Sequence, residues 1–110
     1  MERPVKGDVV VVPFPFSDLS VAKRRPALVV AALRGDDVVL CQITSQAHRD
    51  GYSVSLQESD FERGGLRQPS AIRPNRLFTA DRSLIIYRAG RVMKAKSREV
   101  GQVLARILEV

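Results

Sequence analysis

The side chains best suited to phosphate chemistry stand at the ends of two apolar runs. Arg25 lies immediately before Pro26, and Thr44 and Ser45 follow the run that contains Cys41. Pro26 biases the backbone of Arg25 toward an extended conformation, and a guanidinium offers a fork of donors that suits phosphate oxygens. Hydroxyls at a strand end can donate to the same oxygens, although capping of the strand is their alternative role. Arg25, Thr44 and Ser45 are therefore candidates for a phosphate site, although Arg-Pro is a common pair and a surface arginine before a strand is the simpler interpretation of Arg25 taken alone.

Such a site can cleave RNA without a metal ion. RNA carries its own nucleophile, the 2′-hydroxyl, so a protein need only align that oxygen with phosphorus, neutralise the developing charge and move protons. An arginine and small hydroxyls supply most of this. The sequence has no His-rich or Cys-rich cluster and no acidic residues at metal-ligand spacing, so we expect neither a metal site nor a cofactor.

Two further reactive side chains have simpler interpretations. His48 is the only histidine and lies in a polar stretch, so we expect it to be exposed and without a catalytic role. Cys41 is the only cysteine and lies in an apolar run, which predicts a small buried side chain in a reducing compartment rather than a reactive thiolate.

Positive charge is concentrated in the second half of the chain. The formal net charge is +6, and residues 61–98 hold ten Lys/Arg against two Asp/Glu, whereas residues 1–60 hold seven against eight. A basic face would raise the local concentration of a polyanion. Nucleic acid is the obvious polyanion, an acidic protein segment would also fit, and a solvated surface kept for solubility is the alternative.

Length and composition predict one globular domain, residues 1–110. The 110 residues are 45% hydrophobic and 27% charged, which suits a single core and not a disordered chain. The start of the chain lacks the charged and apolar regions of a signal peptide, and no apolar stretch reaches membrane-spanning length. We therefore expect a soluble cytoplasmic protein with no membrane partner.

The periodicity is mostly that of strands. Buried strands are predicted for 7–14, 26–32 and 38–43, the last two joined by a turn at 34–37, and a half-buried strand is predicted for 52–56. Residues 60–69, with two adjacent glycines, are typical of a loop. Two short strands, 71–72 and 77–79, are separated by Pro74 and Asn75.

The chain is predicted to end in a helix. Ser97 is a suitable N-cap, and the apolar residues after it fall on one helical face: Val100, Val103, Leu104, Ile107 and Leu108. The elements together favour a compact, mostly antiparallel, barrel-like sheet with one or two helices.

The order of the motifs resembles the PemK/MazF family of bacterial toxin ribonucleases. The Val run at 7–14 is followed by Phe16-Ser17-Asp18, by Lys23-Arg24-Arg25-Pro26 and by Ile43-Thr44-Ser45. Residues 66–81, LRQPSAIRPNRLFTAD, resemble the second conserved block of the family, and a terminal helix follows. The resemblance covers nearly the whole chain and implies a mainly β, SH3-like barrel of the PemK/MazF/CcdB type with a C-terminal helix.

The resemblance also implies roles for individual residues. The catalytic residues would be Arg25, Thr44 and Ser45. The RNA-binding residues would be Phe16, Ser17, Lys23, Arg24, Ser70, Arg73, Arg76 and Asp81, with the alternative that Phe16 fills the core. Phe78 departs from the family pattern, because many members have an arginine there. We expect the loss of one phosphate contact, with Arg73 or Arg76 as the replacement.

The function implied is a sequence-specific, metal-independent endoribonuclease toxin, an mRNA interferase. It would cut single-stranded RNA by attack of the 2′-hydroxyl, act as a homodimer, and be neutralised by an acidic antitoxin that occupies the same groove. One alternative is a non-enzymatic poison that binds DNA gyrase, as CcdB does, which has no need of Arg25 with Thr44 and Ser45. A plain RNA-binding or adaptor module is another, but 4 Phe, 2 Tyr and no Trp supply its aromatic platform poorly.

Overall fold

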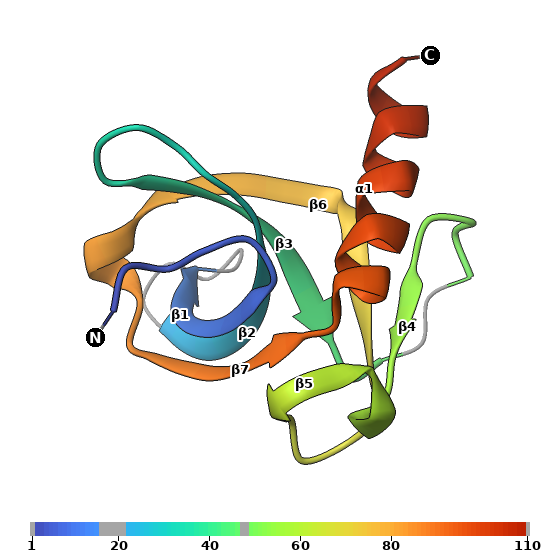
Figure 1. The fold of residues 1–110 in the computed structure, drawn as a ribbon, viewed down its shortest axis with the longest axis horizontal. Coiled ribbons are helices and arrows are strands. Elements are labelled where there is room, and N and C mark those ends of the chain that lie inside the picture. The colour runs from blue at the N-terminus through green and yellow to red at the C-terminus, as the bar shows by residue number, and fades with distance from the viewer. Residues whose placement is uncertain (1, 16–21, 47–48, 110) are drawn as a thin grey trace.

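The computed structural model describes residues 2–15, 22–46 and 49–109. Within them lie the strands and helices β1 (Asp8–Pro15), β2 (Ala22–Ala32), β3 (Asp37–Thr44), β4 (Val54–Leu56), η1 (Glu58–Asp60), β5 (Phe61–Gly64), β6 (Ser70–Asp81), η2 (Arg82–Leu84), β7 (Tyr87–Val92) and α1 (Lys94–Leu108). The strands form one sheet in the order β4-β6-β3-β2-β1-β7-β5, and every neighbouring pair is antiparallel. The sheet curls on itself, with α1 beside it (Figure 1). The expected mainly β, antiparallel architecture with a C-terminal helix is confirmed.

Two apolar clusters hold the sheet in this shape. One lies between the sheet and α1 and contains Val9, Leu28, Cys41, Ile43, Val54, Leu56, Ile72, Val92, Val100 and Val103. The other contains Val10, Val12, Ala27, Val29, Val38 and Leu40, with Phe14 and Phe78 packed against it. Successive valines of β1 fall into different clusters because strand side chains alternate between faces. A continuous Val run therefore marks a strand that is buried on both faces.

Helix α1 begins one turn earlier than predicted. The N-cap is Met93, which has no capping side chain, and the predicted N-cap Ser97 lies in the first turn. The backbone N–H of Met93 donates to the carbonyl of Asp60, which ties the helix start to the end of η1. The predicted apolar face is confirmed at Val100 and Val103, whereas Leu108 is exposed. Within the described chain, no helix is both long and apolar enough to cross a bilayer.

The two short strands predicted around Pro74 are one strand, β6. In its pairing with β3, Arg73 lies opposite Gln42 and Leu77 lies opposite Cys41, so the three residues between Arg73 and Leu77 have no partner on β3. Pro74 is fully buried within this bulge. A proline has no N–H with which to hydrogen-bond a neighbouring strand in the middle of a sheet. Inside a bulge the backbone makes no such bond, so a proline is tolerated there.

The loop predicted for 60–69 is wrong in its first half, because residues 61–64 form β5. Gly64 has φ +67° and pairs with Gly90 of β7. A Cβ on Gly64 would lie 2.3 Å from the carbonyl oxygen of Ala89, so only glycine allows the two strands to approach this closely. The strand β7 (Tyr87–Val92) has no counterpart among the predicted elements. The β5–β7 pair fixes where the following loop, 65–69, leaves the sheet.

The remaining strands lie close to their predicted positions. The turn at 34–37 is confirmed, with Gly35 at φ +78° and Leu33 N–H donating to the Asp37 carbonyl. It joins β2 and β3 as the expected hairpin. Strand β2 begins at Ala22, four residues before the predicted start, so Arg25 lies within the strand.

Candidate functional site

A groove with two parts runs over the surface, and its first part, about 270 Å³, lies where β2, the end of β3 and the loop after β5 meet. We call this part the basic half of the groove, and its lining residues are Lys23, Arg24, Arg25, Pro26, Ile43, Ser45, Leu66, Arg67, Gln68 and Ser70. Four of these side chains are cationic and none is acidic. Buried Ile43 belongs to the core, and the cations come from β2 and the 65–69 loop. Such a surface suits an anion with several oxygens.

Strand pairing positions the central arginine. Arg25 lies opposite Val12 of β1, and Pro26 lies opposite Val11. The Arg25 residue is half-buried, whereas Lys23 and Arg24 are exposed. Strand β2 therefore carries all three cations along one side of the groove, with Arg25 the least exposed of them.

The two adjacent hydroxyl residues at the end of β3 have different surroundings. Ser45 is exposed and lines the groove. Thr44 is buried, and its Oγ1 accepts a hydrogen bond of 3.1 Å from the backbone N–H of Gln46. Thr44 does not line the groove, and its observed contact is the strand-capping role that the sequence left open. It fixes the turn on which Ser45 stands.

A second hollow, about 370 Å³, continues the groove past the end of β3. Its lining residues are Ser45, Gln46, Ser53, Ser55, Pro69, Ser70 and Ala71, and we call it the serine half. It shares Ser45 and Ser70 with the basic half. Not one of the described residues that line it is charged. A chain of alternating phosphates and bases would therefore pass from a cationic surface to a neutral polar one.

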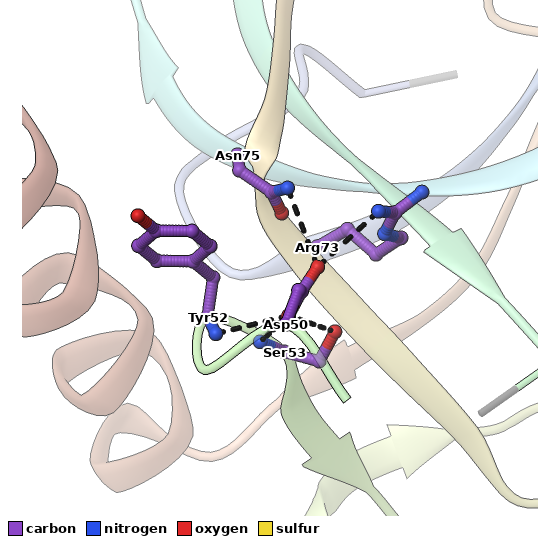
Figure 2. A network of polar contacts seen from close by, with 5 residues as sticks. All are labelled: Asp50, Tyr52, Ser53, Arg73 and Asn75. Atoms are coloured by element: carbon purple, nitrogen blue, oxygen red, sulfur yellow. Dashed lines mark hydrogen bonds and ion pairs between the residues drawn. The ribbon is translucent and has the colours of Figure 1, made fainter. Parts of the chain in front are cut away.

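The wall of the serine half is held by Asp50 (Figure 2). One carboxylate oxygen, Oδ1, accepts from Tyr52 N at 3.0 Å, from Ser53 N at 3.1 Å and from Ser53 Oγ at 3.2 Å. The other, Oδ2, accepts from Arg73 Nη2 at 3.3 Å and from Asn75 Nδ2 at 3.4 Å. Asp50 therefore joins the turn before β4 to the bulge of β6.

These contacts hold the pKa of Asp50 well below its ordinary value. The largest cause is the hydrogen bond from the Tyr52 backbone, followed by those from Ser53 and from Arg73, and partial desolvation opposes them. The carboxylate is thus ionised throughout the physiological range. The sequence reasoning missed this group, although Asp50-Gly51 before an alternating stretch is a signal for a side-chain-stabilised turn, and Gly51 has φ +79°.

The structure brings some of the predicted RNA-binding residues together and places others elsewhere. Lys23, Arg24 and Ser70 line the groove with Arg25 and Ser45. Predicted residues Phe16 and Ser17 lie outside the described residues, as does His48.

Residues of the second conserved block are spread along β6. Arg73 is turned toward Asp50 with 12% of its side chain exposed, and it does not line either half of the groove. Arg76 is exposed. Asp81 lies at the other end of β6 from Ser70, where its side chain caps η2 by accepting from Ser83 N at 2.8 Å. RNA contact by these three residues stays a prediction.

Phe78, which stands where many family members have an arginine, is part of the core. Its ring contacts that of Phe14 edge-to-face, with centroids 4.9 Å apart. Such a pair contributes about 0.5–1.5 kcal/mol beyond the area it buries. The departure from the family pattern therefore replaces a charge with packing between β1 and β6. The added cation at the groove is Arg67, which precedes the block's strand and was not among the predicted site residues.

The basic segment 61–98 does not form one free face. Five of its ten cations make ion pairs, namely Arg73, Arg82, Arg88, Arg91 and Lys96. The shortest of these contacts is at Asp8, a fully buried carboxylate whose Oδ1 accepts from Arg91 Nε at 2.8 Å. That hydrogen bond raises the pKa of Arg91. Half of the cations concentrated in this segment of the sequence are thus paired with carboxylates in the folded protein.

The remaining reactive groups of the described chain do not form a second site. Cys41 is buried in the core, as expected, and desolvation raises the pKa of its thiol to about 12. Among residues 2–15, 22–46 and 49–109 there is no group of three or more His, Cys, Asp or Glu that could hold a metal ion.

The fold of this chain is similar to that of several solved toxin and endoribonuclease structures. The fold matches an endoribonuclease in complex with its cognate antitoxin from a mycobacterial species (18% identity, 97% of this chain and 96% of that one, TM-score 0.78). It also matches MazF from Deinococcus radiodurans (22% identity, 100% of both chains, TM-score 0.75) and the Mycobacterium tuberculosis toxin MazF-mt6 (15% identity, 94% and 97%, TM-score 0.72). At these identities the likeness shows the fold alone, and it confirms the expected MazF-type barrel.

The family follows from the sequence itself. Residues 5–108 match the model of the PemK-like, MazF-like toxins of type II toxin-antitoxin systems. This chain belongs to that family. A search of proteins with curated descriptions gives no match.

Proposed function

We propose that this chain is an endoribonuclease toxin that cuts single-stranded RNA at particular base sequences, without a metal ion and in the cytoplasm, with residues 1–110 acting as one domain. The observation that carries the proposal is the basic half of the groove, which Arg25 lines together with three further cations and with Ser45 and Ser70. The toxin family and the endoribonucleases of the same fold support it.

The reaction is attack by the substrate's own 2′-hydroxyl. The bond from phosphorus to O2′ forms as the bond to O5′ breaks, leaving a 2′,3′-cyclic phosphate and a 5′-hydroxyl. The 2′-hydroxyl gives up one proton and the leaving O5′ takes one, both exchanged with water in the open groove. Negative charge grows on the phosphate oxygens in the transition state, and a preorganised donor there lowers the barrier most.

Each groove residue has a role in that reaction. Arg25 donates to the phosphate oxygens on which charge develops, and Ser45 donates a further hydrogen bond. Thr44 acts through its neighbour, because its Oγ1 holds the N–H of Gln46 and so sets the turn at Ser45. Lys23, Arg24 and Arg67 hold the phosphates on either side of the scissile bond. The basic half thus supplies orientation and charge, while the nucleophile comes from RNA.

The proposed partners follow from the same groove and from the family. An acidic antitoxin segment would fit the cations of the basic half, and antitoxin binding and RNA binding would then compete. One similar structure is an endoribonuclease with its cognate antitoxin. We also propose a homodimer, which light scattering would report as a mass twice the 12.2 kDa of the chain.

The test is to incubate the purified protein with a long single-stranded RNA in EDTA and to map the cut ends. We expect cleavage at a limited set of sites, with a cyclic phosphate on one fragment and a 5′-hydroxyl on the other. Cleavage that EDTA abolishes and magnesium restores would contradict the metal-free mechanism. A protein that leaves RNA intact but inhibits DNA gyrase would favour the CcdB-like alternative.

A further inference from the structure

We propose that the serine half of the groove is a base-reading subsite that accepts hydrogen bonds, and that it therefore favours cytosine, adenine or guanine over uracil. The inference rests on the proposed function, because it assumes that RNA runs through the groove. It goes further by naming which bases the neutral part of the groove selects and which residues select them.

The first step is the direction of two hydrogen bonds. Ser53 Oγ lies 3.2 Å from Asp50 Oδ1, and Ser70 Oγ lies 3.1 Å from the carbonyl oxygen of Gln68. A carboxylate and a carbonyl can only accept, so both serines must donate their single hydroxyl proton to the protein. Each serine oxygen can then only accept a hydrogen bond from a ligand in the groove. Two of the four serines that line this half are therefore acceptors for any ligand.

The second step is that Asp50 stays ionised, so the direction of the Ser53 hydrogen bond does not reverse. Asp50 keeps its negative charge because the backbone of Tyr52 and Ser53 and the guanidinium of Arg73 all donate to it. A protonated Asp50 could return a proton to Ser53, but its lowered pKa excludes that state at physiological pH.

The third step is the match with RNA. Unstacked bases in single-stranded RNA are read by hydrogen bonds at their edges. Cytosine, adenine and guanine each carry an exocyclic amino group, whose two N–H donors match two acceptor hydroxyls. Uracil has the O4 oxygen at the position where cytosine has its amino group, and its only donor on that edge is the single N3–H. An O4 facing Ser53 and Ser70 would set acceptor against acceptor. The apolar side chains of Pro69 and Ala71 give the ring a surface, and about 370 Å³ lies within the range of small-ligand sites, roughly 300–1,000 Å³.

The test compares two matched pyrimidine probes. Hexamers of cytidine and of uridine carry the same phosphates and differ at two positions of the base edge: the amino group replaces O4, and N3 is an acceptor in cytosine but an N–H donor in uracil. Their affinities are measured by fluorescence anisotropy in the Arg25→Ala background, which slows cleavage enough for binding to be measured. We expect the cytidine hexamer to bind roughly tenfold more tightly, the upper end for one or two hydrogen bonds between neutral groups. In the double variant Ser53→Ala/Ser70→Ala the ratio should fall close to one.

The chain offers a matched control in Ser83. Its backbone and its hydroxyl both donate to Asp81, which repeats the contact between Ser53 and Asp50, but at the opposite end of β6. Ser83→Ala should leave the ratio of affinities unchanged. Thermal melting of every variant shows whether a loss of preference reflects a loss of folding.

The outcomes distinguish failure of the base-reading subsite from failure of the proposed endoribonuclease activity. Equal affinity for the two hexamers, or a preference that survives in Ser53→Ala/Ser70→Ala, overturns the subsite, even if the wild-type protein cuts RNA. A preference that depends on these serines in a protein that never cuts RNA supports the subsite and overturns the proposed endoribonuclease. With an active wild type, cut sites in a randomised RNA should lack uracil at one position near the scissile bond.

Discussion

The basic half and the serine half of the groove meet at Ser45 and Ser70, yet they present opposite chemistry. The basic half offers cationic donors and suits acceptors, which phosphates are. The serine half offers lone pairs whose direction is set by Asp50 and by the Gln68 carbonyl, and it suits donors. A nucleic acid strand carries both kinds of group in alternation. If the proposed function and subsite hold, the basic half determines binding strength and catalysis and the serine half determines the choice of base.

The largest expected effect concerns the scissile nucleotide itself. RNA with a 2′-deoxy sugar immediately 5′ of the cut site should resist cleavage completely, because the proposed nucleophile is missing. Its binding should change little, since both halves of the groove keep their other contacts. Gel analysis of a single-site substrate measures the cleavage. If the modified strand is cut at the normal rate, water is the nucleophile and the role of the basic half must be reassigned.

Arg25→Ala should cause the next largest loss. Removal of one preorganised donor at a developing charge typically lowers the rate by a factor of about 100–1,000. We expect a fall of at least that size in single-turnover cleavage, with the base preference of the remaining cuts unchanged. Arg34→Ala is the control, because Arg34 lies in the exposed β2–β3 turn. Equal activity of the two variants would remove Arg25 from the mechanism.

Reversing single charges should separate the strength of RNA binding from the preference for a base. Arg24→Glu and Arg67→Glu should each weaken both hexamers several-fold and reduce the slope of log affinity against log salt by about 0.7, the value for one phosphate contact on a single strand. Arg73→Met should leave that slope unchanged, since Asp50 already neutralises Arg73 at 3.3 Å. A slope that falls with Arg73→Met would show instead that Arg73 leaves Asp50 to bind phosphate.

Much of this fold was predictable because local and tertiary preferences agree. The Val run of β1, the turn at 34–37 and the apolar face of α1 each follow one periodicity, and each lies close to its expected place. The failures have tertiary causes. The glycines at 64 and 65 are typical of a loop, but Gly64 serves a close approach to Gly90 that no local pattern reveals.

The sequence predicted the parts of the site that follow from the order of motifs along the chain. It did not predict the parts that depend on which side chains contact one another in the fold. Arg25 and Ser45 line one groove, as the order of the motifs suggested, although Arg25 lies within β2 and not at its end. RNA contact by Arg73 stays a prediction, but nothing in the linear chain reveals that its guanidinium forms an ion pair with Asp50, 23 residues away. The serine half was missed for a similar reason. Which atom a hydroxyl donates to is a property of the folded structure alone.

A smaller effect is expected from Asp50→Asn. The pKa of Asp50 is lowered in the folded protein, so its contribution to stability is complete well above the unfolded value of about 3.9 and is lost as pH falls below that value. The wild type should therefore lose more stability than Asp50→Asn between pH 6 and pH 3, measured as urea midpoints. The variant should also weaken the preference for cytidine at neutral pH. Parallel pH profiles would contradict the ionised state on which the serine half depends.

Thr44→Val should have the smallest effect, and it tests how the two halves are joined. The substitution keeps the branched shape and removes Oγ1, which accepts from Gln46 N at 3.1 Å. Loss of that bond should cost about 1 kcal/mol of unfolding free energy and slow cleavage by a small factor, because Ser45 is then less well placed. Thr44→Ser, which keeps the hydroxyl, should recover both. The resemblance to the family implies a larger role, direct contact of Thr44 with the scissile phosphate. A loss of a hundredfold or more in turnover with unchanged stability would favour that role, and Thr44 would then belong with Arg25 in the basic half.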